Sequence, residues 1–204
     1  MQTAPGTPSA VEISPATVMA EDDARLVASA QADAREFGPL YSRYADPVYR
    51  YCYRKLGHPE TAADATAQVF VQALAALPGY RLRGASFRAW LFTIAHNVIV
   101  DHYRARRQVA PIAEAAHVPT AEPSPEERLL RDEAGSTVRA LLATLPAEQR
   151  QILELRLAGL AGSEIAAVLG RTPGAVRVAQ VRAIARLRET LASSDSNVQA
   201  RGPR

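Results

Sequence analysis

A proline-rich stretch near the middle of the chain sets the strongest limit on how these 204 residues fold. Between Ala110 and Pro125 the sequence has four prolines, no aromatic residue and no hydrophobic periodicity, which predicts a flexible linker. On both sides of it the apolar residues recur at spacings typical of amphipathic helices, and no segment shows the alternation of a strand. We therefore expect an all-α fold, with two small helical domains joined by a flexible linker.

The composition places the boundaries of these parts. Residues 1–22 and 193–204 are polar or rich in proline, serine and threonine, and we expect both to be disordered tails. The first helical domain is predicted at 23–109, the linker at 110–124 and the second helical domain at 125–192.

Capping signals mark helix starts inside the two domains. Asp46-Pro47 and Thr172-Pro173 each pair an N-cap side chain with a proline in the first turn, and Ser86 can cap the helix that follows it. Each of these side-chain oxygens accepts a hydrogen bond from an N–H group that the first turn leaves unpaired. We expect a helix to begin at each signal.

Several kinds of function are excluded by what the sequence lacks. Its single cysteine, Cys52, excludes a disulfide framework and a cysteine-based zinc cluster, and it is expected to be a small buried hydrophobic residue. The glycine-rich motifs that bind nucleotides or carry a nucleophilic serine are missing. His96 and His102 are six residues apart, which places them on different sides of a helix. We expect no enzyme activity, no cofactor and no metal site.

The sequence also argues against a membrane protein. No apolar run approaches the roughly 18–20 residues that a membrane span needs. The N-terminus lacks the basic-then-apolar pattern of a signal peptide. We expect a cytoplasmic protein with no direct membrane insertion.

The formal net charge of +3 is the sum of blocks of opposite sign. Residues 1–34 carry −4, residues 35–110 carry +6, residues 111–135 carry −4 and residues 136–204 carry +5. Two basic blocks separated by an acidic stretch are typical of two modules that bind a polyanion. An alternative stays open, because Lys55 is the only lysine and a GC-rich genome also enriches a chain in arginine.

The strongest local motif predicts a helix-turn-helix in the second domain. Where two short helices pack closely, the first needs a small residue at the contact, the turn favours glycine, and the second needs an inward apolar residue. Ala166, Gly170 and Val176 meet these needs in that order. The second helix would then turn its arginines toward DNA. A plain pair of helices inside a bundle is the alternative.

Both halves of the chain resemble the sigma-70 family of bacterial transcription initiation factors. The segments of the first half that resemble sigma region 2 are 37–44, 62–70, 86–97 and 101–104. The second half resembles region 4 through residues 145–157 and 170–183. The two regions in this order, across a proline-rich linker, resemble the extracytoplasmic-function (ECF) class, which keeps only these two regions. The resemblance covers about residues 23–192.

The resemblance implies that the chain directs transcription initiation as a sigma factor. Its partners would be core RNA polymerase (the β′ clamp and the β flap), promoter DNA and an anti-sigma factor. Nothing in residues 1–20 or 193–204 looks like an inhibitory domain, so we expect inhibition by a separate protein. The alternative function is a stand-alone helix-turn-helix regulator, which would bind DNA without polymerase. Such a regulator normally carries a receiver domain with strands, and the first 110 residues predict none.

In this family the helix that matches residues 62–77 docks on the coiled coil of the β′ clamp. The resemblance carries this role to Asp64, Thr66, Gln68, Val69 and Gln72. Ala63 stands where glutamate is common, and Ala67 stands where a polar residue is common. Packing in the hydrophobic core is the alternative for Val69.

The loop and helix at 80–97 match the part of region 2 that meets the melted minus-ten element. Melted DNA needs a basic path for phosphates and polar groups for base edges. The residues that the resemblance assigns to this element, or to the duplex phosphates just upstream, are Arg81, Arg83, Arg88, His96, Asn97, Arg104, Arg106 and Arg107. His96 stands where the family often has a basic residue, so charge there depends on pH. Trp90 lies on the apolar stripe, which favours packing over base stacking.

The helix-turn-helix matches the part of region 4 that reads the minus-thirty-five element. The residues assigned to this element are Arg171, Thr172, Arg177, Gln180, Arg182 and Arg186. At Val178, Ala179 and Val181 the family often has serine, arginine and histidine. The apolar Val178 and Val181 leave two alternatives open, contact with thymine methyl groups or with a protein partner.

Overall fold

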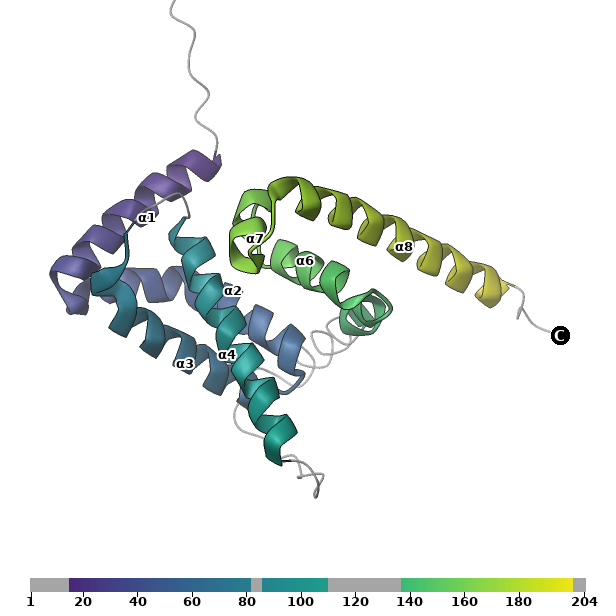
Figure 1. The fold of residues 1–204 in the computed structure, drawn as a ribbon, viewed down its shortest axis with the longest axis horizontal. Coiled ribbons are helices and arrows are strands. Elements are labelled where there is room, and N and C mark those ends of the chain that lie inside the picture. Colours follow the sequence, from purple (N-terminus) through teal and green to yellow (C-terminus); the bar gives the residue numbers. More distant parts are fainter. Residues whose placement is uncertain (1–14, 82–85, 110–136, 200–204) are drawn as a thin grey trace, which may run out of the picture.

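The structure is a computed structural model that describes residues 15–81, 86–109 and 137–199. Over these ranges the chain forms helices and turns with no strand, which confirms the all-α prediction. The elements in chain order are α1 (Pro15–Ala32), the 3-10 helix η1 (Ala34–Phe37), α2 (Gly38–Leu56), α3 (Pro59–Ala76), the 3-10 helix η2 (Leu77–Gly79), α4 (Phe87–Val109), α6 (Ala147–Leu157), α7 (Gly162–Leu169) and α8 (Pro173–Gln199) (Figure 1). Residues 137–143 are also helical.

We refer to residues 15–109, with α1–α4, as the N-terminal module, and to residues 137–199 as the C-terminal module. The predicted linker at 110–124 lies outside the described residues. In the N-terminal module α2, α3 and α4 pack together, with α1 against them. The largest fully buried side chains of this module are Leu40, Val48, Tyr51, Leu77, Phe87, Leu91, Phe92 and Ile99.

The helix α2 runs through a position where a new helix was expected to begin. Asp46-Pro47 was predicted to cap and start a helix, whereas Pro47 lies inside a continuous α2. A proline in a helix interior costs about 3 kcal/mol, because it removes one hydrogen bond and crowds the preceding turn. Tyr44 and Val48, on either side of it, are 2% and 0% exposed, so packing on both sides offsets this cost.

Two helices are longer than the predicted boundaries. α1 begins at Pro15, inside the predicted tail at 1–22, and α8 continues to Gln199, inside the predicted tail at 193–204. Proline suits the first turn of a helix, where its missing N–H group is not needed. Residues 16–32 and 175–199 contain neither glycine nor proline, so no helix breaker interrupts either one.

The other capping signals are confirmed. The hydroxyl oxygen of Ser86 accepts a hydrogen bond from the N–H of Ala89 at 3.2 Å. That of Thr172 accepts one from the N–H of Ala175 at 3.3 Å. Cys52 is a free, fully buried thiol, as expected, and burial raises its pKa to about 11.

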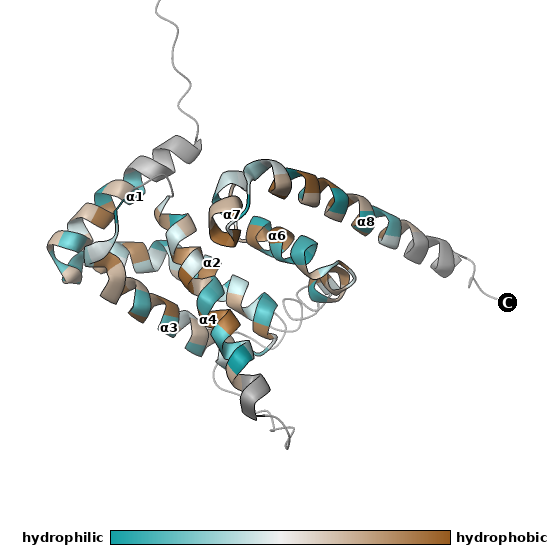
Figure 2. Ribbon diagram, viewed as in Figure 1, coloured by the Kyte–Doolittle hydropathy of each residue, from teal (hydrophilic) through white to brown (hydrophobic). Residues whose placement is uncertain are grey.

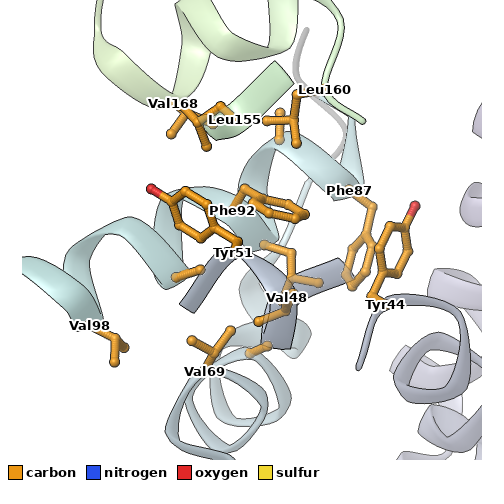
Figure 3. Packing of buried hydrophobic residues seen from close by; sticks show 14 of the residues in the cluster. Tyr44, Val48, Tyr51, Val69, Phe87, Phe92, Val98, Leu155, Leu160 and Val168 are labelled. Atoms are coloured by element: carbon orange, nitrogen blue, oxygen red, sulfur yellow. The ribbon is translucent and has the colours of Figure 1, made fainter. Parts of the chain in front are cut away.

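The two modules share one hydrophobic core. Leu155, Leu160 and Val168 of the C-terminal module lie over Tyr51 and Phe92 of the N-terminal module (Figure 3). Figure 1 shows α7 beside the first turns of α4, and α8 extending away from the N-terminal module. The sequence predicts each module, but it does not predict this contact.

Among the residues that the structure describes, no helix is long and apolar enough to span a bilayer.

Candidate functional site

The residues that we predicted to bind polymerase and DNA lie on three helical surfaces. The docking candidates lie on α3, the minus-ten candidates on α4 and the turn before it, and the minus-thirty-five candidates on α8 and the turn before it. Arg83 lies outside the described residues, as do the side chains of Arg106 and Arg107.

The helix α3 divides its five candidates between its outer face and the hydrophobic core. Asp64, Gln68 and Gln72 are exposed. Val69 is fully buried, and Thr66 is 8% exposed and donates its hydroxyl hydrogen to the carbonyl oxygen of Ala62. The side chain of Val69 therefore lies in the hydrophobic core, and that of Thr66 reaches the surface only where it lines a pocket beside α3.

A shallow pocket opens beside the exposed part of α3. It is lined by Tyr41, Ala45, Asp46, Tyr49, Ala63, Thr66 and Ala67. Ala63 and Ala67 are the positions where the sequence departs from the family pattern, and their short side chains leave this space open. Val71 and Leu74 extend the apolar surface along α3, with 68% and 39% of each residue exposed.

Arg88, near the start of α4, is paired across the module boundary with Glu164 of α7. Its Nη2 donates to Oε2 at 2.7 Å and its Nε donates to Oε1 at 3.2 Å, a two-bond pairing that fixes orientation as well as distance. The side chains of Arg88 and Glu164 are only 20% and 12% exposed. Arg88 is therefore not free to meet a phosphate while the modules are in contact.

The Glu164 carboxylate also accepts hydrogen bonds from two further donors. It accepts hydrogen bonds from the Ser86 hydroxyl and from the N–H of Ala161. Burial alone would raise the pKa of Glu164, but the hydrogen bonds from Arg88, Ser86 and Ala161 outweigh it and lower the pKa below its ordinary value of 4.5. The carboxylate thus stays ionised at neutral pH and joins the starts of α4 and α7.

A second polar contact between the modules involves His96 of α4. The side-chain nitrogen of Gln151 lies 3.2 Å from Nδ1 of His96. Burial lowers the pKa of His96 below 6.5, and the positive charge of Lys55 lowers it further. A positive charge at this position is therefore disfavoured while α6 covers it.

A third contact pairs Lys55 of α2 with Glu154 of α6, whose side chains are 15% and 5% exposed. Close by, the guanidinium of Arg139 lies 4.7 Å from the centroid of the Tyr53 ring. Charged and aromatic side chains of both modules thus surround the shared core.

The remaining minus-ten candidates lie on the surface of the N-terminal module. Asn97 is exposed. Arg81 donates to the carbonyl oxygens of Pro78 and Tyr80, both at 2.9 Å. Arg104 donates to Asp101 at 3.3 Å. These side chains stay open to a partner from solution.

Trp90 is half-buried beside two other aromatic rings. Its ring centroid lies 4.8 Å from that of Tyr80 and 5.4 Å from that of Phe87. These contacts place Trp90 in the apolar cluster, in line with the expectation from its position on the helix.

The predicted helix-turn-helix is formed by α7, a turn and α8. Gly170 ends α7 with a φ of 61°, in the left-handed region that favours glycine. Ala166 and Val176, at the contact between the two helices, are 3% and 1% exposed. The order of small residue, glycine turn and inward apolar residue is confirmed.

Most of the minus-thirty-five candidates are exposed. Arg177, Arg182 and Arg186 point into solvent, whereas Gln180 is half-buried on the side of α8 nearer the module core. In the turn, Arg171 lies 3.4 Å from the carboxylate of Glu148, and both side chains are more than half exposed. This surface is therefore open, in contrast to Arg88 on α4.

Sequence reasoning missed Glu164 and Glu154, which bind cations of the other module. α7 is otherwise uncharged and largely apolar (Gly-Ser-Glu-Ile-Ala-Ala-Val-Leu), and one carboxylate in such a helix indicates that a donor lies nearby. Which donor it meets depends on how the modules pack. Over the described ranges, no three His, Cys, Asp or Glu side chains come close enough to hold a metal ion.

Comparison with known proteins places the two modules in known families of domain. Residues 40–109 match the family model for sigma-70 region 2, and residues 136–187 match that for sigma-70 region 4.

Full-length relatives agree with these matches. The chain is 34% identical to the ECF RNA polymerase sigma factor SigD of Mycobacterium tuberculosis over 193 residues, covering 90% of this chain and 91% of SigD. It is 36% identical to the ECF RNA polymerase sigma factor BldN of Streptomyces coelicolor over 170 residues, covering 81% of this chain and 64% of BldN. Among solved structures, CnrH in complex with the cytosolic domain of CnrY matches with a TM-score of 0.64 and 31% identity, covering 84% of this chain and 97% of that one.

Proposed function

Because this chain belongs to the extracytoplasmic-function class of the sigma-70 family, we propose that it binds core RNA polymerase and directs the polymerase to promoters for transcription initiation. The observation that carries this proposal is the helix-turn-helix, in which Val176 and Ala183 face inward while Arg177 and Arg182 are exposed along α8. A basic recognition helix of this kind is suited to the major groove of duplex DNA.

Each surface has a separate task in this proposal. The exposed Asp64, Gln68 and Gln72 of α3 dock on the β′ clamp, and the C-terminal module contacts the β flap. The side chains that meet the melted minus-ten element are Arg81, Arg83, Arg88, His96 and Asn97, with Arg104, Arg106 and Arg107 on the duplex phosphates upstream. The minus-thirty-five element meets α8 and the turn before it, through Arg171, Thr172, Arg177, Arg182 and Arg186. The half-buried Gln180 is less suited to this role.

We place this activity in the cytoplasm, where polymerase and chromosome are. The proposal assigns no catalytic step to any residue of the chain, since polymerase itself makes the RNA.

We also propose control by a separate inhibitor, an anti-sigma factor. The support is twofold. The sigma factor CnrH, 31% identical to this chain, has been solved with the cytosolic domain of another protein, CnrY. In addition, a protein with exposed arginines on both modules would bind nucleic acid without selection unless its surfaces were covered.

The experiment that tests the function is runoff transcription with purified chain and core RNA polymerase on genomic fragments. We expect transcripts from a defined set of start sites that require both components. No promoter-specific transcript, together with no co-purification with core enzyme, would contradict the proposal. A stand-alone regulator would instead bind its DNA sites tightly without polymerase.

The anti-sigma proposal has its own test. Partners are captured from cells before induction, and the isolated chain is assayed with core enzyme. We expect the isolated chain to be active and a captured protein to inhibit it. If the isolated chain is inactive until residues 1–22 are removed, the inhibitor is part of the chain itself.

A further inference from the structure

The outward face of α8 carries small and apolar side chains where a DNA-binding helix usually carries polar ones. At about 100° per residue, four positions among residues 174–188 point within about 30° of the direction opposite to the inward-facing Val176 and Ala183. These four residues, which we call the α8 crest, are Gly174, Val178, Val181 and Ala185. Val178 is 49% exposed and Val181 is 62% exposed. Figure 2 shows brown and teal segments alternating along this helix.

Packing among the residues that the structure describes does not explain the α8 crest. Val178 and Val181 belong to neither cluster of buried side chains. A Cβ atom added at Gly174 would meet no atom of the described residues within 4 Å, so packing against them does not require a glycine there. A glycine without a packing reason suits the close approach of another molecule to the backbone.

The charges beside the crest indicate which molecule approaches. Arg177 flanks it on one side and Arg182 on the other, and Arg188 continues the basic flank. Among residues 173–192 the single acid is Glu189, one turn beyond Ala185. An apolar crest with a guanidinium group on each side matches the major groove, where the base edges lie between two phosphate backbones.

The chemistry of the crest then selects the base. Valine offers no hydrogen bond, so it cannot read the donors and acceptors of guanine, cytosine or adenine. Thymine alone presents a methyl group in the major groove. A second protein could also cover an apolar crest, but its surface would need acidic groups on both sides of an apolar groove.

We propose that Val178 and Val181 read thymine methyl groups in the upstream promoter element, with Arg177 and Arg182 holding the flanking backbone or bases. This inference rests on the function proposed above, and it names the chemistry that α8 recognises. Val178 and Val181 stand where the resemblance implies serine and histidine, and in this proposal the two valines supply the specificity in place of those side chains.

The test uses the chain bound to core polymerase, on a promoter duplex that runoff transcription has already defined. Each thymine of the upstream element is replaced in turn by deoxyuridine, which removes only the methyl group and keeps the base pair. We expect binding to weaken about three- to fivefold at one or more positions, the effect of removing one buried methyl contact. The same substitutions are then measured with Val178→Ala and Val181→Ala.

The variants decide whether the valines carry the effect. We expect the deoxyuridine penalty to disappear in Val178→Ala or Val181→Ala and to persist in Leu191→Ala, a matched control that trims another exposed apolar residue of α8. An upstream element without thymine, no penalty in the unaltered chain, or an equal penalty in every variant would overturn the inference. A chain that forms no promoter complex at all would instead overturn the proposed function, so the two failures are distinguishable.

Discussion

Two arginine–glutamate pairs, one on each predicted DNA surface, differ in geometry, in burial and in whether they join two modules or lie within one. Arg88 and Glu164 join the two modules at 2.7 Å, with side chains 20% and 12% exposed. Arg171 and Glu148 lie within the C-terminal module at 3.4 Å, with side chains 57% and 56% exposed. An exposed pair contributes about 0–1 kcal/mol and is screened by salt, whereas a buried two-bond pair is shorter, stronger and costly to break.

The difference shows that the two proposed DNA surfaces are not equally available. α8 can meet duplex DNA as it stands. Arg88 and His96, which we propose as part of the minus-ten surface, are covered by α7 and α6, and under this proposal these helices move before the two side chains contact DNA. We call the conformation with the modules in contact the closed arrangement. If only a fraction of molecules is open, the apparent affinity of the covered surface falls by that fraction.

The largest effect is expected from a charge placed in the shared core. Val168→Asp would put a carboxylate without a partner at a side chain that is 6% exposed, and would weaken the module contact by about 3–5 kcal/mol. We expect the radius of gyration from small-angle scattering to rise. Val181→Asp is the control, because Val181 is 62% exposed on α8 and should leave the radius unchanged.

Circular dichroism shows whether the Val168→Asp chain is still folded. Helix content should stay close to that of the unaltered chain, since α4 and α8 do not depend on the contact for their own hydrogen bonds. A folded Val168→Asp chain with an unchanged radius of gyration would contradict the shared core.

Glu164→Gln should give the next largest effect. The substitution keeps the size of the side chain but removes the charge, and the loss of the pair costs about 1–3 kcal/mol at a site this well buried. We expect a single-stranded oligonucleotide with the minus-ten sequence to bind up to about tenfold more tightly, as measured by fluorescence anisotropy, because more molecules are open. Binding of the duplex minus-thirty-five element should not change.

A second variant shows whether Arg88 itself contacts the oligonucleotide. Arg88→Ala opens the same pair but removes the proposed phosphate contact, so the gain seen with Glu164→Gln should be lost. Equal oligonucleotide binding by both variants would place Arg88 outside the DNA contact.

The closed arrangement should also respond to pH, with a smaller effect. The pKa of His96 is lowered by burial and by Lys55, so the closed form disfavours the protonated ring. The contribution of neutral His96 to the stability of the closed arrangement is therefore complete above pH 6.5, the ordinary pKa of histidine. This contribution decreases as the pH falls below 6.5. The pKa of Glu164 is lowered as well, and its contribution is present above 4.5 and lost in more acidic solution.

His96→Gln separates these two effects. The variant should lose the decrease in stability that begins near pH 6.5 and keep the decrease in more acidic solution. Small-angle scattering at a series of pH values measures both. A pH profile identical to that of the unaltered chain would show that His96 does not contribute.

The smallest effect is expected at the exposed pair. Glu148→Gln should change the thermal midpoint by no more than the roughly 0–1 kcal/mol of a surface pair. It removes one negative charge beside Arg171, so binding of the upstream duplex to polymerase-bound chain should tighten slightly at low salt and not at high salt. An effect as large as that of Glu164→Gln would remove the distinction between the two pairs.

The features that sequence reasoning predicted are those encoded by a few neighbouring residues. The turn at Gly170 and the caps at Ser86 and Thr172 each depend on contacts within about one helical turn, so spacing alone reveals them. The continuous α2 was missed because packing on both sides of Pro47 outweighs the local preference for a break.

The contact between the modules could not be predicted, because its partners are far apart in sequence. Ser86 and Arg88 meet Glu164 across 78 and 76 residues. For Val69, sequence left docking and core packing as alternatives, and its fully buried side chain fits core packing. Residue type and spacing do not determine how two helical modules pack against each other. Glu164, a single carboxylate in an otherwise uncharged helix, indicates a donor nearby but not which one.

The covalent connection between the modules, residues 110–136, decides how much the contact between them matters. Tethered modules meet at an effective concentration on the order of millimolar, whatever the amount of protein in the cell. A contact too weak to form between separate chains is therefore formed in a large fraction of molecules when both modules belong to one chain. Dilution of the protein does not dissociate it. A cut within 110–136 would convert it into an ordinary bimolecular contact that vanishes at low concentration. A partner that binds between the modules competes against this local concentration, whereas one that binds only the outer face of α3 or α8 does not.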